Sequence, residues 1–164
     1  MNALEAIGKR RSVRKYTGES IPRKDLEKIV NAGRLAATGS NQQPWDFIVV
    51  TDRAMIEQLK IAAEWMEKAA AIIAVVMDPS SRWWVEDGSA AVENMLIATT
   101  ALGYGSCWLE GYTLPHEEEF KKLLGIPKEK RLLTLVPIGV PAEEPTREKK
   151  KKRSLQEVLH WERY

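Results

Sequence analysis

The sequence predicts a single domain in which helices cover a β-sheet, in either a mixed α/β or an α+β arrangement. Short apolar runs rich in β-branched residues alternate along the chain with stretches of helical periodicity. The runs are apolar at nearly every position, which indicates strands covered on both faces. With 164 residues, 44% of them hydrophobic, the chain is long enough for one sizeable core. We therefore expect one domain over residues 1–164.

The elements follow from periodicity and from Gly and Pro signals. Helices are expected at 3–9, from Ser20 and Pro22 to Gly33, at 53–70, at 85–102, and around Phe120 to Leu124. Strands are expected at Phe47–Val50, Ala71–Met77, Ser106–Leu109 and Leu132–Val136, with Pro137 at the end of the last one. A final helix is expected to carry Leu155, Val158, Leu159 and Trp161.

Composition excludes several classes of protein. The net charge of +2 is too small for a general nucleic-acid binder. No apolar run is long enough to span a bilayer, and the first residues do not resemble a signal peptide. The single cysteine, Cys107, suits a reducing compartment and is expected to be a packing residue. We therefore expect a cytoplasmic protein with no membrane segment and no nucleic-acid partner.

The segment Arg10-Arg11-Ser12-Val13-Arg14-Lys15 places four cations and a hydroxyl within six residues. Arginine forks match phosphate oxygens, and serine adds a short neutral donor. The segment therefore predicts a site for a small phosphate group, although a solvated basic surface run would have the same composition.

Two further segments suit a flat heterocycle. The amides of Asn41 and Gln43, just before Pro44 and Trp45, offer donors and acceptors for a ring edge. Glu110-Gly111 follows a predicted strand, and glycine lets backbone approach a flat ligand. Alternatively, the first is a polar loop that caps a strand and the second an ordinary strand end.

No side-chain arrangement in the sequence indicates a catalytic nucleophile and base, and His116 and His160 lack metal-ligand spacing. We therefore expect no metal and no catalytic side chain, because the chemistry would belong to a cofactor. The run Lys149–Arg153 is either a solvated linker or a second basic element. The apolar residues after this run are expected to be buried, either against the same subunit or against a partner.

Taken together, these motifs resemble the nitroreductase family of flavoproteins. The resemblance rests on R-R-S-x-R-x-[FY], S-x-N-x-Q-P-W, W-x-E-G after A-x-G-x-G, and the basic tail that ends in x-W-x-x-Y. It implies an α+β fold with a central, mostly antiparallel sheet flanked by helices, in an intertwined homodimer with composite active sites at the interface. It also implies FMN as cofactor and ping-pong transfer of hydride from NADH or NADPH to an acceptor such as a nitroaromatic, a quinone or a flavin.

The resemblance also assigns residues. Arg10, Arg11, Ser12 and Arg14 match the phosphate-binding positions, and Lys151 and Arg153 match C-terminal cations that return to the phosphate. Asn41 and Gln43 match amides that approach the flavin from the second subunit, and Glu110 and Gly111 match backbone that faces flavin N5. Residues 141–164 would form an extension that packs on the partner.

The chain differs from longer family members in one connection. Only Asp78 to Val85 joins the second predicted strand to the long helix, whereas longer members carry an insertion there that shapes substrate choice. Trp83 or Trp84 would either form a replacement lid or pack in the dimer. One other function remains open, a flavin carrier or sensor without turnover. A basic protein that binds nucleic acid ranks far behind, because the net charge is small.

Overall fold

The computed structural model describes residues 1–143 and 152–164. The helices are α1 (Ala3–Lys9), α2 (Arg23–Arg34), α3 (Arg53–Leu59), α4 (Trp84–Ala101), α5 (Glu110–Thr113) and α6 (Glu117–Leu124). The strands are β1 (Trp45–Val50), β2 (Ala71–Met77), β3 (Gly105–Ser106) and β4 (Arg131–Gly139). Short 3₁₀ turns occupy 39–41, 60–62, 64–68, 114–116 and 155–157.

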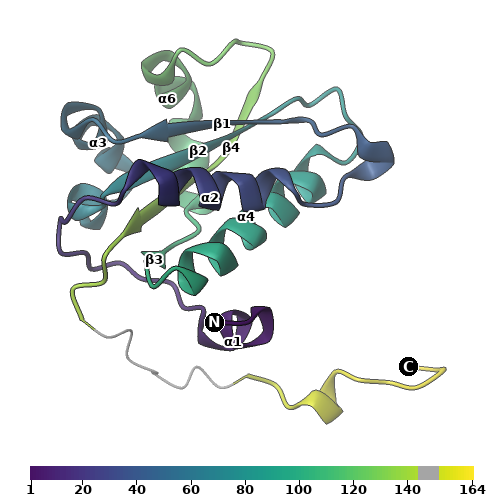
Figure 1. Ribbon diagram of the computed structural model, residues 1–164. Helices are drawn as coiled ribbons and strands as arrows, with labels where there is room; N and C mark the ends of the chain where they lie inside the picture. Colours follow the sequence, from purple (N-terminus) through teal and green to yellow (C-terminus); the bar gives the residue numbers. More distant parts are fainter. Residues whose placement is uncertain (144–151) are drawn as a thin grey trace.

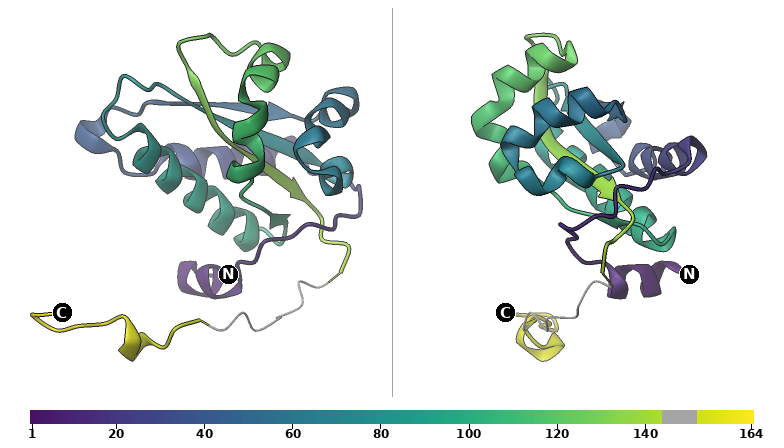
Figure 2. Two further views of the ribbon diagram at one scale, coloured as in Figure 1. Left: turned by 180° about the vertical axis from the view of Figure 1, so that it is seen from behind. Right: turned by 90° about the vertical axis from the view of Figure 1, so that its left-hand side faces the viewer.

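The strands form one sheet in the order β1-β2-β4-β3, and every neighbouring pair is antiparallel. Figures 1 and 2 show α2 and α4 on one face of this sheet and α3 and α6 on the other. The expected α+β fold, a mostly antiparallel sheet flanked by helices, is therefore confirmed.

Strand β2 is the centre of the core because both of its faces are covered. Its odd-numbered residues, such as Ile73, pack with α2 and α4, while its even-numbered residues, such as Ile72, pack with α3 and α6. Next to β2, strand β4 has a register shift opposite Val75 and Val76. The shift changes which face each side chain takes, as a bulge does, so both Leu133 and Val136 reach the α2 and α4 layer.

The helix expected at 53–70 is wrong in its second half. Helix α3 ends at Leu59, and Ala63 is extended at φ −167° and ψ 115° between two 3₁₀ turns. Ala62 and Met66 nevertheless face the same core cluster as Ile56. The apolar residues keep their helical spacing across the break at Ala63, so the sequence pattern could not show that the helix ends there.

Two chain positions were also predicted wrongly at the sheet. Pro137 lies inside β4, opposite Ile72. Proline is tolerated here because β3 ends at Ser106, so no strand residue needs an N–H donor from position 137. The Pro137 carbonyl on that side is still used, since it accepts the Cys107 N–H at 3.3 Å. The strand expected at Ser106–Leu109 is correspondingly short, and α5 begins directly after Leu109.

The expected C-terminal helix is reduced to one 3₁₀ turn, Leu155–Glu157, closed by a Ser154–Glu157 capping box. Figure 1 shows residues 152–164 apart from the sheet and its helices. Within the described parts of the chain, no helix has the length and apolar character needed to cross a bilayer.

Candidate functional site

The basic segment, residues 10–16, runs along the edge of the sheet next to β3. Ser12 forms a parallel bridge with Ser106, and the Val13 N–H donates to the Ser106 carbonyl at 2.9 Å. At the other end of the segment, the Tyr16 hydroxyl donates to the Val13 and Pro137 carbonyls at 2.8 and 3.2 Å. Burial raises the pKa of this hydroxyl well above its ordinary value, so it stays a donor.

A pair of glycines makes this docking possible. Gly105 of β3 and Gly139 of β4 lie opposite one another in the sheet. A Cβ on Gly105 would lie 2.7 Å from the Cβ of Val13, and one on Gly139 would lie 2.6 Å from Cδ1 of Tyr16. Because these two positions have no side chain, Val13 and Tyr16 can pack directly on the backbone of the sheet. The sequence showed both glycines but could not show that they are neighbours.

With Val13 and Tyr16 buried, their neighbours in the segment point outward. Ser12 and Arg14 are exposed, and Arg10, at the end of α1, is half-buried with its Nε 3.5 Å from Oε1 of Glu93. Arg11 is used differently. Its Nη1 donates to the Gly8 and Arg10 carbonyls at 3.1 and 2.7 Å, so part of this guanidinium stabilises the end of α1.

Arg10, Ser12 and Arg14 all belong to the short segment beside β3, where Ser12 bridges Ser106. Burial raises the pKa of the Cys107 thiol, and Arg14, Ser12 and Arg10 act against this rise. Two guanidinium groups and a hydroxyl are a donor set that fits a phosphate dianion. Cys107 itself is buried, as expected of a packing residue.

Trp65 was missed by sequence reasoning. The Arg14 guanidinium lies 5.9 Å from the centre of the Trp65 ring, and the Tyr16 and Trp65 rings lie 6.3 Å apart. These residues line a cavity of about 360 Å³ beside the basic segment. Trp65 lies in the misread part of the 53–70 helix, so its place next to Arg14 depended on the break at Ala63.

Glu110 and Gly111 form the first turn of α5. The chain is fixed just before them by the Leu109 N–H, which donates to the Leu135 carbonyl of β4 at 3.0 Å. Glu110 is half-buried and Gly111 exposed, with open space where a Cβ would stand. The first N–H groups of a helix have no partner within it. This turn therefore offers backbone donors three residues after Cys107.

Asn41 and Gln43 lie in residues 39–43, here called the amide loop. Ser40, Asn41 and Gln43 have φ values of 52°, 55° and 50°, in the left-handed region that residues with a side chain enter at about 1–2 kcal/mol each. Gln43 Nε2 donates weakly to the carbonyl and the side-chain oxygen of Asn41 at 3.4 and 3.3 Å. Such a backbone persists only when its surroundings hold it, which is typical of functional loops.

The amide loop and the basic segment are separated in a single chain. Both contact α4, the loop through Asp87 and the basic segment through Glu93. Six residues of helix turn the contact point by about 120° around the axis and move it about 9 Å along it. Figure 1 shows the α2–β1 connection, which carries the loop, at one end of α4 and α1 towards the other.

Of the two predicted C-terminal cations, only Arg153 lies in the described part of the chain, and it remains apart from the other candidates. Arg153 is exposed, and its Nη2 donates to the Glu157 carbonyl. Lys151 lies outside the described residues. The structure thus places Arg10, Ser12 and Arg14 on one segment beside β3, and it leaves the amide loop and residues 152–164 elsewhere.

Comparisons with known proteins agree with these motifs. The sequence model of the Nitroreductase family matches residues 7–71 and 55–140. A protein of Archaeoglobus fulgidus, named provisionally as an NADH dehydrogenase/NAD(P)H nitroreductase, is 42% identical over 86% of this chain and 86% of its own length.

Solved structures give the same result. A Parabacteroides distasonis protein with the same provisional name superposes with a TM-score of 0.89 at 30% identity, and the match covers 100% of each chain. A Bacteroides fragilis nitroreductase solved with bound FMN has a TM-score of 0.82 at 28% identity, covering 99% of this chain and 100% of its own.

Proposed function

Because this chain belongs to the nitroreductase family, as its motifs predicted, we propose that it is an FMN-dependent oxidoreductase that draws electrons from NADH or NADPH. The FMN in the Bacteroides fragilis relative supports the choice of cofactor, and the name of the Archaeoglobus relative supports the nicotinamide donor. When bound, FMN supplies N5, the atom that takes up a hydride and passes it to an acceptor.

The observation that carries this proposal is the basic segment docked on the Gly105–Gly139 pair. The backbone of this segment is paired with β3 at Ser12 and Val13 before any ligand binds. A phosphate would therefore have to order only the side chains of Arg10, Ser12 and Arg14. Arg11 would contribute with the part of its guanidinium that does not bind the end of α1. Arg153 and Lys151 would add charge from the tail.

The chain would act as a homodimer with composite sites. One copy places its basic segment and its amide loop on different sides of α4. A second copy could bring its amide loop to the first copy's basic segment, so that Asn41 and Gln43 bind the ring edge while Arg10 and Arg14 bind the phosphate. The backbone N–H groups of Glu110 and Gly111 would then face the reacting side of the ring and stabilise the charge that develops there.

Turnover would be ping-pong, with a nitroaromatic, a quinone or a free flavin as acceptor and no ionisable side chain required for hydride transfer. The test of the function is the absorption spectrum of the purified protein before and after anaerobic NADH or NADPH. A flavin spectrum that either nucleotide bleaches supports the enzyme. Bound flavin that neither nucleotide reduces would instead favour a carrier or sensor.

The phosphate assignment has its own test in the variant Arg10→Ala. We expect FMN affinity to fall by about 1.5–3 kcal/mol, the contribution of a hydrogen bond to a charged group. The fold should survive, because the long contact of Arg10 with Glu93 is partly exposed and stabilises little. Arg23→Ala on α2, which removes an exposed arginine paired with Glu27, is the matched control. Equal FMN affinity in all three proteins would contradict the assignment.

A further inference from the structure

The hydrogen bonds of the amide loop all lead back to its own beginning. The Asn41 N–H donates to the Thr38 carbonyl and the Gln42 N–H to the Gly39 carbonyl, each at 3.1 Å. The Gln43 N–H donates to Oγ1 of Thr38 at 3.2 Å. These bonds give the loop its shape but do not fix it to the rest of the fold. Its far end is held where β1 begins, since the Pro44 carbonyl accepts the Asp78 N–H at 2.7 Å. The orientation of Asn41 and Gln43 therefore also depends on what holds Gly39 at the near end.

Asp87 is the residue that holds it. Oδ1 of Asp87, in the first turn of α4, accepts the Gly39 N–H at 3.1 Å, and the aspartate is 5% exposed. Its second oxygen, Oδ2, is buried with no partner among the described residues. A buried carboxylate with an unsatisfied oxygen destabilises a fold, even at a helix N-terminus that favours negative charge. The single bond to Gly39 offsets this cost only in part, so the role of Asp87 lies in what that bond positions.

Trp83 holds Gly39 from another side. A Cβ on Gly39 would lie 2.3 Å from Cε3 of the Trp83 indole, so the ring packs directly on the glycine backbone. The Trp83 side chain remains 38% exposed, with the Arg82 guanidinium 5.6 Å from its ring. Within its own chain, the indole at the end of the short Asp78–Val85 connection therefore supports the amide loop.

We propose that Asp87 is a positioning residue for the cofactor site, with Trp83 as its partner in holding the amide loop. The carboxylate fixes the Gly39 N–H, the indole fixes its Cα, and the left-handed residues beyond are thereby aimed outward as a preformed pair of amides. The proposal rests on the proposed function, because it assigns those amides to FMN. Asp87 does not touch the cofactor and acts only through Gly39.

The test compares Asp87→Ala with Asn94→Ala, a matched control on the same helix. Asn94 also makes one bond from an α4 side chain to a neighbouring backbone, from Nδ2 to the Ala32 carbonyl at 3.1 Å, and it does so away from the loop. Asp87→Asn keeps an acceptor at Oδ1 and serves as the conservative rescue. Each variant is measured for FMN affinity, for hydrogen exchange of residues 38–43 in flavin-free protein, and for unfolding temperature.

We expect Asp87→Ala to weaken FMN binding by about tenfold, because binding must then order the two freed amide side chains. The same variant should speed exchange in residues 38–43. Asp87→Asn should restore both properties. Asn94→Ala should lower the unfolding temperature without changing either. If Asp87→Ala does not fold, Trp83→Ala provides the second variant, and it should speed exchange in the same residues.

The proposal is overturned if exchange in residues 38–43 is unchanged in Asp87→Ala, or if Asn94→Ala weakens FMN binding equally. A wild-type protein without FMN affinity would instead refute the proposed function. In that case the exchange data still decide whether Asp87 holds the loop.

Discussion

The carboxylate of Glu117 at the start of α6 is the best-bonded buried acid among the described residues. It accepts hydrogen bonds from Arg131 at 2.7 and 2.9 Å and from the Leu132 N–H at 3.0 Å. Burial alone raises the pKa of Glu117, but the bonds from Arg131 and Leu132 outweigh it, so the pKa lies below its ordinary value of 4.5. Ionised Glu117 therefore ties α6 to β4.

This pair predicts a pH dependence of stability. Because the folded pKa of Glu117 is depressed, its contribution is complete above the unfolded value near 4.5 and is lost as the pH falls through the folded value. Glu117→Gln should lower the free energy of unfolding by about 1.5–3 kcal/mol at neutral pH, and by less in acid. Urea unfolding at several pH values measures this, with the exposed Glu19→Gln as control. A deficit that stays constant down to the lowest pH would contradict it.

At this scale the sequence predicted chemistry better than geometry. The exposure of Ser12 and Arg14 follows from their alternation with apolar Val13 and Tyr16, so a phosphate-binding face could be predicted. The binding of Arg11 to the end of α1 could not, because it depends on where the helix stops. Asp87 gave no signal either, since an acid in the first turn of a helix is ordinary.

At the scale of elements, apolar runs and helical spacing found the strands and the long helices because these are covered by neighbours in a regular way. The break at Ala63 was missed because the residues on either side still face one core cluster. The basic segment was predicted as a motif, but its attachment to the sheet required knowing that Gly105 and Gly139 pair across two strands.

That attachment can be tested with Gly139→Ala. The new methyl group would lie 2.6 Å from the Tyr16 ring, so the ring and the basic segment must shift. Overpacking of this kind costs about 1–3 kcal/mol, and we expect FMN affinity to fall as Ser12 and Arg14 move. Gly8→Ala, at a glycine in α1 with open space around it, should leave FMN affinity unchanged and should not destabilise the fold. Wild-type affinity in Gly139→Ala would show that the glycine pair does not position the phosphate site.

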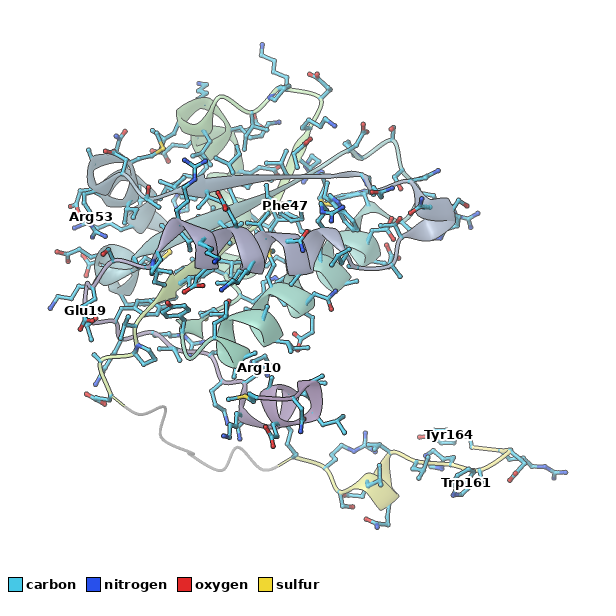
Figure 3. All side chains as sticks on the ribbon, in the orientation of Figure 1. Arg10, Glu19, Phe47, Arg53, Trp161 and Tyr164 are labelled. Atoms are coloured by element: carbon cyan, nitrogen blue, oxygen red, sulfur yellow. The ribbon has the colours of Figure 1, made fainter. Side chains whose placement is uncertain are left out.

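At the scale of the whole molecule, one chain leaves apolar side chains in water at its end. Leu155, Val158, Leu159 and Trp161 are 63%, 51%, 42% and 76% exposed. Figure 3 shows Trp161 and Tyr164 on a segment that extends away from the sheet. Fully burying each large side chain contributes about 1.5–3 kcal/mol. The sequence could predict that these apolar side chains are buried in the functional protein. It could not predict which surface buries them, because that surface is not part of the same chain's core.

We predict that the second copy supplies the cover and that the tail links dimer formation to cofactor binding. Removing residues 144–164 deletes the apolar residues together with Lys151 and Arg153. It should therefore lower both dimer stability and FMN affinity, since ligand and partner stabilise the same assembled state.

A full-length variant with serine at Leu155, Val158 and Leu159 separates the two contributions. It keeps the cations, so it should dissociate as readily as the truncated protein while retaining more FMN at protein concentrations where both are dimers. Light scattering over a dilution series gives the oligomeric state, and flavin absorbance gives the occupancy. A truncated protein that stays dimeric and fully loaded would remove the tail from both roles, and a wild-type monomer with bound FMN would rule out a site shared between two chains.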